Sequence, residues 1–113
     1  MLAFTACAGG AEHAVLEQFF AASRLRDFNA LEKVSSVIFE PRQDGTVLSW
    51  EIDSIRQTSS ESEEVLVNAT VRLPSGVVQR KPLLVTLKRV KDRWNVASVR
   101  VSTESTSASS RQP

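Results

Sequence analysis

Apolar side chains recur at spacings of three and four near the start of the chain. This periodicity predicts a helix over residues 11–25 with one apolar side. Glu12 near its beginning and Arg24 near its end agree with the helix dipole, which favours negative charge first and positive charge last. The apolar stripe needs a partner surface, and we expect that surface to be a sheet. The stripe consists of Val15, Leu16, Phe19, Phe20 and Ser23.

A second, shorter helix is predicted to begin at Asn29. Asn29 can cap the helix, and Glu32, three residues later, can reach back to the cap. Leu31 and Val34 then point inward. Residues 40–45, Glu-Pro-Arg-Gln-Asp-Gly, are typical of a turn and end any helix.

After this turn, apolar residues recur at every second position, which predicts strands. In the first strand, Leu48, Trp50 and Ile52 share one face. Ile55 falls out of phase with them, so we expect a bulge or a strong bend near Ser54.

Three further strands follow a polar loop that is expected at 58–63. The alternation over 65–73 indicates a half-buried strand, 77–90 a long strand and 94–101 the last one. Pro82 interrupts the long strand and cannot donate a hydrogen bond to a central ladder. We therefore expect either a bulge at Pro82 or a position in which its missing N–H faces outward.

The order of elements predicts an α+β fold, with N-terminal helices packed on a curved antiparallel sheet of about four strands. This domain is expected to cover residues 11–102. Residues 1–10 are small and apolar and are expected to be flexible. Residues 103–113 are rich in Ser and Thr without a large apolar side chain, which predicts a disordered tail.

Three stretches carry a resemblance to a known family: 15–22 (VLEQFFAA), 26–31 (RDFNAL) and 87–99 (LKRVKDRWNVASV). They resemble the opening helix, the second-helix entry and the closing hairpin of the NTF2-like superfamily, with its cystatin-like cone. Arg26 stands where glycine is common. The resemblance implies the fold and, among short members, a secreted or lipid-anchored bacterial type, but no particular chemistry.

Phe4-Thr5-Ala6-Cys7 resembles the lipobox of a bacterial lipoprotein, in which the cysteine becomes the lipidated first residue of the mature protein. Only six residues precede Cys7, so this interpretation requires a start upstream of Met1. The protein would then lie in the bacterial cell envelope, periplasmic or extracellular, as a lipid-anchored protein. Otherwise Cys7 is an incidental thiol, and the protein is cytoplasmic.

The composition of the chain argues against some classes of function. The 113 residues, 42% of them hydrophobic, can bury a core, and one cysteine with one histidine argues against Cys-based or His-rich metal sites. The net charge of +1 argues against nucleic-acid binding. The charge is uneven, however, with a balance of −6 over residues 1–71 and +7 over 72–113. The two halves either pair with each other or leave a basic face for anionic lipid or an acidic partner.

The sequence contains few candidates for catalytic residues. In particular, it has no tyrosine, so a tyrosine cannot stabilise an oxyanion beside an acidic residue. Asp53 and His13 are weak catalytic candidates. Asp53 could approach the mouth of the cone if the bend near Ser54 reverses the strand phase. Arg80 could then form an anion-binding pair with it, although surface pairing across strands is favoured. No cofactor or metal is expected.

The binding candidates fall into two groups. Candidates for lining a ligand pocket are Phe19, Trp50, Arg80 and Trp94, although large aromatic residues more often fill the core. Candidates for an interaction surface on the exposed sheet face are Arg72, Lys88 and Arg100.

The leading hypothesis is a non-enzymatic NTF2-like domain that binds a protein partner, a second copy of itself or a small apolar ligand. It would be anchored in the envelope or serve as an accessory subunit of a complex. The alternative is a small cone-type isomerase or cyclase that acts on an apolar ligand.

Overall fold

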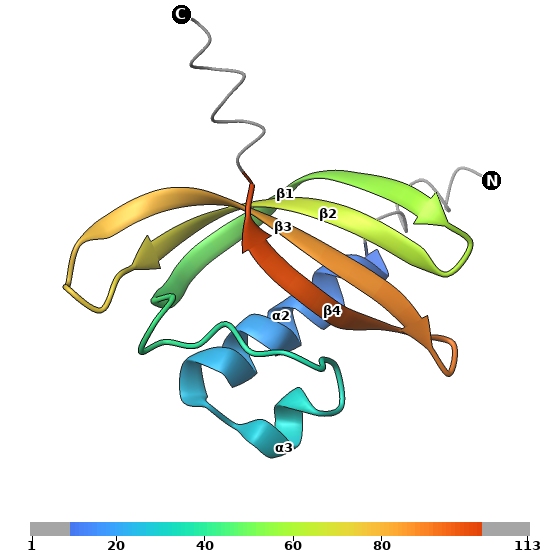
Figure 1. The fold of residues 1–113 in the computed structure, drawn as a ribbon, viewed down its shortest axis with the longest axis horizontal. Helices are drawn as coiled ribbons and strands as arrows, with labels where there is room; N and C mark the ends of the chain where they lie inside the picture. The colour runs from blue at the N-terminus through green and yellow to red at the C-terminus, as the bar shows by residue number, and fades with distance from the viewer. Residues whose placement is uncertain (1–9, 103–113) are drawn as a thin grey trace, which may run out of the picture.

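The computed structural model describes residues 10–102, in which two helices precede a four-stranded antiparallel sheet (Figure 1). Each strand pairs with the next, in the order β1-β2-β3-β4, so the predicted α+β class is confirmed. Residues 1–9 and 103–113, and with them the expected flexible segment and tail, lie outside the described residues. The elements are α2 (Gly10–Leu25), α3 (Phe28–Leu31), β1 (Thr46–Ser59), β2 (Ser62–Arg72), β3 (Val78–Val90) and β4 (Arg93–Val101).

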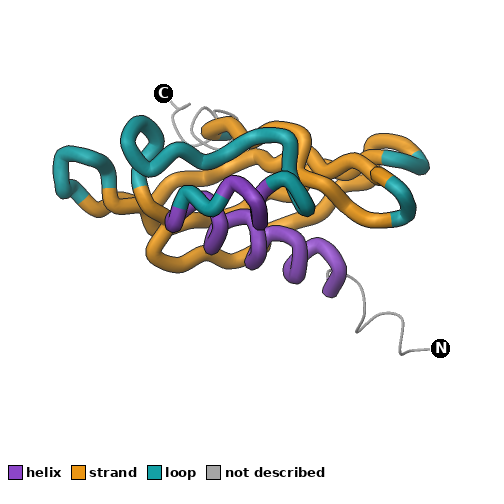
Figure 2. Tube along the Cα trace, turned by 90° about the horizontal axis from the view of Figure 1, so that it is seen from below, coloured by secondary structure: helices purple, strands orange, loops and turns teal. Residues whose placement is uncertain are grey.

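The helices lie on one face of the sheet (Figure 2), and the core forms between α2 and this inner face. Leu16 and Phe19 are fully buried, as the apolar stripe of the helix predicted. Side chains alternate in direction along a strand, so every second residue of β2 and β3 joins them. Fully burying one such apolar side chain contributes about 1.5–3 kcal/mol. The fully buried residues of β2 and β3 are Val65, Val67, Ala69, Val71, Leu83, Val85 and Leu87, and Val96 of β4 is fully buried as well.

The segment between α3 and β1 covers the outer edge of β4. Ser35 forms a parallel bridge with Val96, and the Ser36 N–H donates to the Val96 carbonyl oxygen at 3.0 Å. The Val96 N–H in turn donates to the Val34 carbonyl oxygen at 2.8 Å. Within residues 10–102, β1 is therefore the strand whose outer edge has no backbone partner.

The predicted bulge in β1 is confirmed. The pairing with β2 shifts register between Ile52 and Ser54, which makes Asp53 the extra residue. The shift restores Ile55 to the face that carries Ile52, opposite Val65 of β2.

Two other expectations about β1 were wrong. Leu48 does not point inward, because an earlier register shift leaves it exposed and Val47 is buried in its place. The polar stretch 58–63 is not a long loop, because β1 continues to Ser59 and β2 begins at Ser62. Backbone pairing extends the hairpin here although its side chains are polar.

Pro82 occupies the second of the two expected positions. Its pairing with Asn68 of β2 carries no register shift, and its carbonyl oxygen accepts from the Ser102 N–H at 2.8 Å. The N and O atoms of one strand residue point to the same side. The missing N–H of Pro82 therefore faces past Val101, where β4 has ended, and no ladder bond is lost there.

The second helix begins one residue earlier than expected, and its cap differs. The Asp27 carboxylate accepts a hydrogen bond from the Ala30 N–H at 3.2 Å, whereas Asn29, the expected cap, lies inside the helix. Asp27 takes this role because its backbone is extended while the next residues are helical.

Arg26 links the end of α2 to the following loop. Its φ of +53° is left-handed, a conformation that glycine adopts at the least steric cost. Its guanidinium donates to the Glu40 carboxylate at 3.2 Å. The Arg42 backbone N–H and the Arg26 guanidinium together lower the pKa of Glu40.

Candidate functional site

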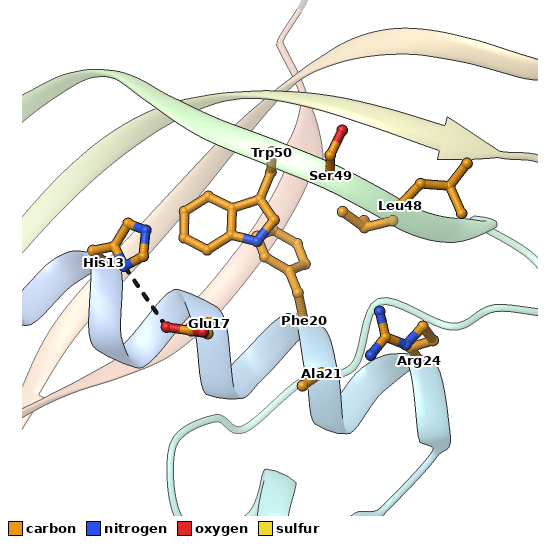
Figure 3. A pocket seen from close by; sticks show the side chains of 9 residues that line it. His13, Glu17, Phe20, Ala21, Arg24, Leu48, Ser49 and Trp50 are labelled. Atoms are coloured by element: carbon orange, nitrogen blue, oxygen red, sulfur yellow. Dashed lines mark ion pairs between the residues drawn. The ribbon is translucent and has the colours of Figure 1, made fainter.

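A groove of about 370 Å³ lies between α2 and β1 (Figure 3). Trp50 points from β1 toward α2, with its ring centroid 4.7 Å from that of His13 and 5.4 Å from that of Phe20. The three rings give the groove an aromatic wall, which suits a flat apolar ligand. The lining residues are His13, Glu17, Phe20, Ala21, Arg24, Val47, Leu48, Ser49 and Trp50.

Polar groups stand at the rim of this groove. His13 Nδ1 lies 3.8 Å from a carboxylate oxygen of Glu17, one helical turn away, as the dashed line in Figure 3 marks. Both side chains are more than half exposed, so water screens the pair. Arg24 follows Glu17 by seven residues, roughly 10 Å along the helix. The groove has room for a small ligand. The His13 imidazole at its rim is exposed to water, whereas a catalytic base is usually enclosed.

The other catalytic candidate lies elsewhere. Asp53 is exposed in the β1 bulge and lines neither this groove nor the cleft described below. The hypothetical Asp53–Arg80 pair does not form, because Arg80 instead lies 3.8 Å from Glu51 in an exposed contact. This is the surface pairing across strands that the sequence favoured.

The four predicted pocket residues do not line one pocket. Phe19 is fully buried in the core, with its ring 5.2 Å from that of Phe20. Arg80 is exposed on the sheet face that α2 does not cover, and only Trp50 lines the groove. Trp94 lines a different cleft.

This second cleft, which we call the hairpin cleft, lies between α2 and the turn that joins β3 to β4. Its volume is about 370 Å³. The Arg89 guanidinium lies 4.4 Å from the centroid of the Trp94 ring, in a cation–π contact at the cleft wall. The lining residues are Ala11, Ala14, Val15, Gln18, Lys33, Val34, Arg89, Asp92, Arg93 and Trp94.

The three predicted interaction residues all lie on the sheet face opposite the helices, which we call the outer face, but they are spread along its length. Arg72 stands opposite Val78 at one end of β3, Lys88 lies ten positions further along β3, roughly 33 Å away, and Arg100 lies between them, opposite Leu84. Each strand contributes every second residue to the outer face, and its centre is the half-buried pair Leu66–Leu84. Two of its acidic residues form ion pairs, since Glu51 contacts Arg80 and Glu64 pairs with Arg56. Arg72, Lys88 and Arg100 are exposed and form no ion pair with any residue of 10–102.

One pair of carboxyl groups escaped the sequence analysis. Glu12 in the first turn of α2 is buried, and Glu63 faces it from the inner side of β2. Burial and the neighbouring Glu12 carboxyl raise the pKa of Glu63 to about 7, against the opposing effect of Arg89. Neither carboxyl lines the groove or the hairpin cleft, so a substrate in these spaces does not reach them.

Within residues 10–102, the chain contains no cluster of three or more His, Cys, Asp or Glu side chains that could hold a metal ion. None of the helices in this part of the chain is long and apolar enough to cross a membrane.

Comparison with known proteins identifies two solved structures with a similar fold. Neither a protein-family model nor a curated protein sequence matches the chain. An NTF-2 like protein of unknown function from Shewanella oneidensis MR-1 is similar in structure, with a TM-score of 0.57 and 12% identity over 82% of this chain and 97% of that one. A SEC-C motif containing protein from Rhodopseudomonas palustris is similar with a TM-score of 0.59 and 15% identity, over 79% and 77% of the two chains. The chain is thus an α+β domain of the NTF2-like fold.

Proposed function

We propose that this domain is a non-enzymatic binding module of the bacterial cell envelope, and that its outer face contacts an acidic protein partner. The observation that carries the proposal is the charge of this face. Arg72, Lys88 and Arg100 project from it without an ion-pair partner among residues 10–102. Protein interfaces are enriched in arginine and need not be more apolar than the remaining surface.

An acidic partner fits this face better than a second copy does. Two identical outer faces would bring the same three unpaired cations against each other, and like charges in contact oppose association. Charge complementarity instead favours a surface that carries carboxylates. The exposed large apolar side chains do not form one patch on the outer face, because Leu25 and Phe28 belong to the helices and Val78 and Val90 lie at opposite ends of β3. The contact would therefore be mainly polar and sensitive to salt.

Cys7, which lies outside the described residues, is the proposed anchor. The lipobox-like Phe4-Thr5-Ala6-Cys7 supports this assignment, and Cys7 precedes the first residue of α2, Gly10, by only three positions. A tether at this point would leave the outer face free for a partner.

A small flat ligand in the groove is the second candidate function. The aromatic wall formed by Trp50, His13 and Phe20 supports it. Binding there would change the fluorescence of Trp50, and a Trp50→Leu variant would show whether the signal arises from the groove. The isomerase or cyclase alternative has less support, because the exposed His13 and Asp53 offer no enclosed acid or base.

The contact surface can be tested by crosslinking in cells. A photoreactive residue at Ser98, which is exposed on the outer face, should give one discrete crosslink to another protein. The same residue at Glu32, on the helix side, should not. The double reversal Lys88→Glu, Arg100→Glu should abolish the product, whereas Arg42→Glu, a single reversal on an exposed loop, should preserve it.

Three results would contradict the proposal. They are the absence of a crosslink from Ser98, a crosslink that the double reversal leaves unchanged, and a product that consists of two copies of this chain.

A further inference from the structure

Positive charge predominates among the charged residues that line the hairpin cleft. Lys33, Arg89 and Arg93 line it, and Asp92 is its single carboxylate. The rest of the wall is mostly apolar or small. A lining that combines cationic side chains with apolar ones suits a ligand that has both an anionic group and a hydrocarbon part.

Arg89 is held in place for such a role. Its guanidinium packs on the Trp94 ring at 4.4 Å, and its backbone N–H donates to the Glu61 carbonyl oxygen at 2.8 Å. A guanidinium fixed by stacking keeps its N–H groups in a planar fork, which matches the oxygen atoms of a phosphate.

The turn beside the cleft adds further charge. Lys91 and Asp92 have φ values of +51° and +65°, as a two-residue hairpin turn requires, and Asn-Gly is the favoured sequence for this geometry. The chain places a charged pair there instead, followed by Arg93. Val90, next to the turn, is about half exposed. The hairpin tip thus combines cationic side chains with an exposed apolar one, a combination found on surfaces that contact membranes.

The hairpin cleft lies at the end of the molecule where α2 begins. Figure 1 shows α2 beginning at the end where the β3–β4 hairpin turns, and Ala11 and Ala14 of α2 line the cleft. Cys7 and Gly10 are three positions apart, so the chain between them can span at most roughly 10 Å. This end also carries acidic residues. Glu61 lies at the β1–β2 turn, whereas Glu12 and Glu63 face each other in the interior.

We propose that the hairpin cleft binds the phosphate group of an anionic phospholipid, so that the domain rests on the membrane with its β3–β4 hairpin against the headgroups. The proposal takes the membrane location from the proposed function, but the cleft itself is a separate site. The outer face is a different surface and remains available to a protein partner.

Vesicle binding by the protein without its anchor tests this inference. The Cys7→Ser chain should sediment with vesicles made of equal parts phosphatidylcholine and phosphatidylglycerol, but not with phosphatidylcholine alone. High salt should release it, because the contact is electrostatic. The double variant Lys33→Glu, Arg93→Glu should bind the mixed vesicles at least roughly tenfold more weakly. Both positions are exposed, so the fold should survive, and circular dichroism would verify this.

The matched control carries the same change of charge at the far end of the sheet. Arg72→Glu, Arg80→Glu should bind the mixed vesicles much more strongly than the cleft variant does. An equal loss of vesicle binding in the two double variants would show that only net charge matters, and this would overturn the inference. Failure of the Cys7→Ser chain to bind the mixed vesicles would also overturn it. Binding of soluble glycerophosphate without vesicle binding would overturn the membrane assignment. None of these results depends on whether Cys7 is acylated, so the anchor is tested separately.

Discussion

At the residue scale, one buried serine joins the main helix to the loop behind it. Ser23 is 2% exposed, and its hydroxyl oxygen accepts a hydrogen bond from the Phe39 N–H at 3.1 Å. Ser23→Ala would keep the helix but leave this N–H without its acceptor in a buried place. We expect the free energy of unfolding to fall by about 1–3 kcal/mol, measured by chemical denaturation.

Ser75 provides the control for this prediction. It lies in an exposed turn, where its hydroxyl accepts a longer hydrogen bond of 3.4 Å from the Val77 N–H. Ser75→Ala should change the stability by no more than a few tenths of a kcal/mol. Equal losses in the two variants would contradict the role assigned to Ser23.

The carboxyl of Glu63 makes stability depend on pH. Its pKa is about 7 in the folded chain against an ordinary value of 4.5, so between these values the folded state binds more protons than the unfolded state. Stability from this group is therefore fully present below about pH 4.5 and is lost as the pH rises through 7. Glu63→Gln removes the cost of ionisation and should stabilise the chain at pH 8 by roughly 1–2 kcal/mol. This figure is about half of the full conversion, because Glu63 is partly exposed.

Urea denaturation of Glu63→Gln at pH 5 and pH 8 would measure this effect. The gain should be much smaller at pH 5, where the wild-type carboxyl is mostly protonated. Glu64→Gln, at the next position but paired with Arg56 on the outer face, should show no gain at pH 8. A gain for Glu63→Gln that is equal at the two pH values would contradict the raised pKa.

Glu63 also shows where sequence reasoning stopped short. It lies two positions before Val65, and the alternation of the strand therefore places both on the inner face. The stretch 58–63 is polar throughout, so its composition favours a loop and hides the strand alternation that runs through Glu63. The position of Glu63 was readable from the sequence. Its contact with Glu12 was not, because that contact depends on how α2 crosses the sheet.

At the element scale, hydrophobic periodicity predicted the long helix, all four strands and a bulge or bend near Ser54. These features follow from local spacing, because a core covers one face of each element. Leu48 was placed wrongly because a second bulge, after Val47, moves it out of phase without a break in the apolar pattern. The cap was missed for a related reason. Asp27 and Asn29 both suit a helix start, and the backbone conformation after Arg26 decides between them.

At the scale of the whole molecule, strand alternation predicts which side chains share a face of the sheet. It does not predict which of them line the same pocket. It placed Arg72, Lys88 and Arg100 on the same face of the sheet, and the structure has all three on the outer face, spread along its length. The pocket candidates dispersed, since Phe19 fills the core while Trp50 and Trp94 line opposite margins of α2. The two clefts arise where the narrow helix leaves the edges of the wider sheet uncovered. Such margins depend on tertiary packing rather than on any local pattern.

The proposed arrangement has a tether at one end, a cationic cleft beside it and a charged face that is open to a partner. Envelope anchoring through Cys7 is central to it, and the most direct test is the intact mass and detergent partitioning of the protein produced from its native locus, beside a Cys7→Ala variant. We predict an acyl mass on Cys7, recovery in the detergent phase, and loss of membrane association in the variant. An unmodified Cys7 thiol on a protein that partitions into the aqueous phase would contradict the account.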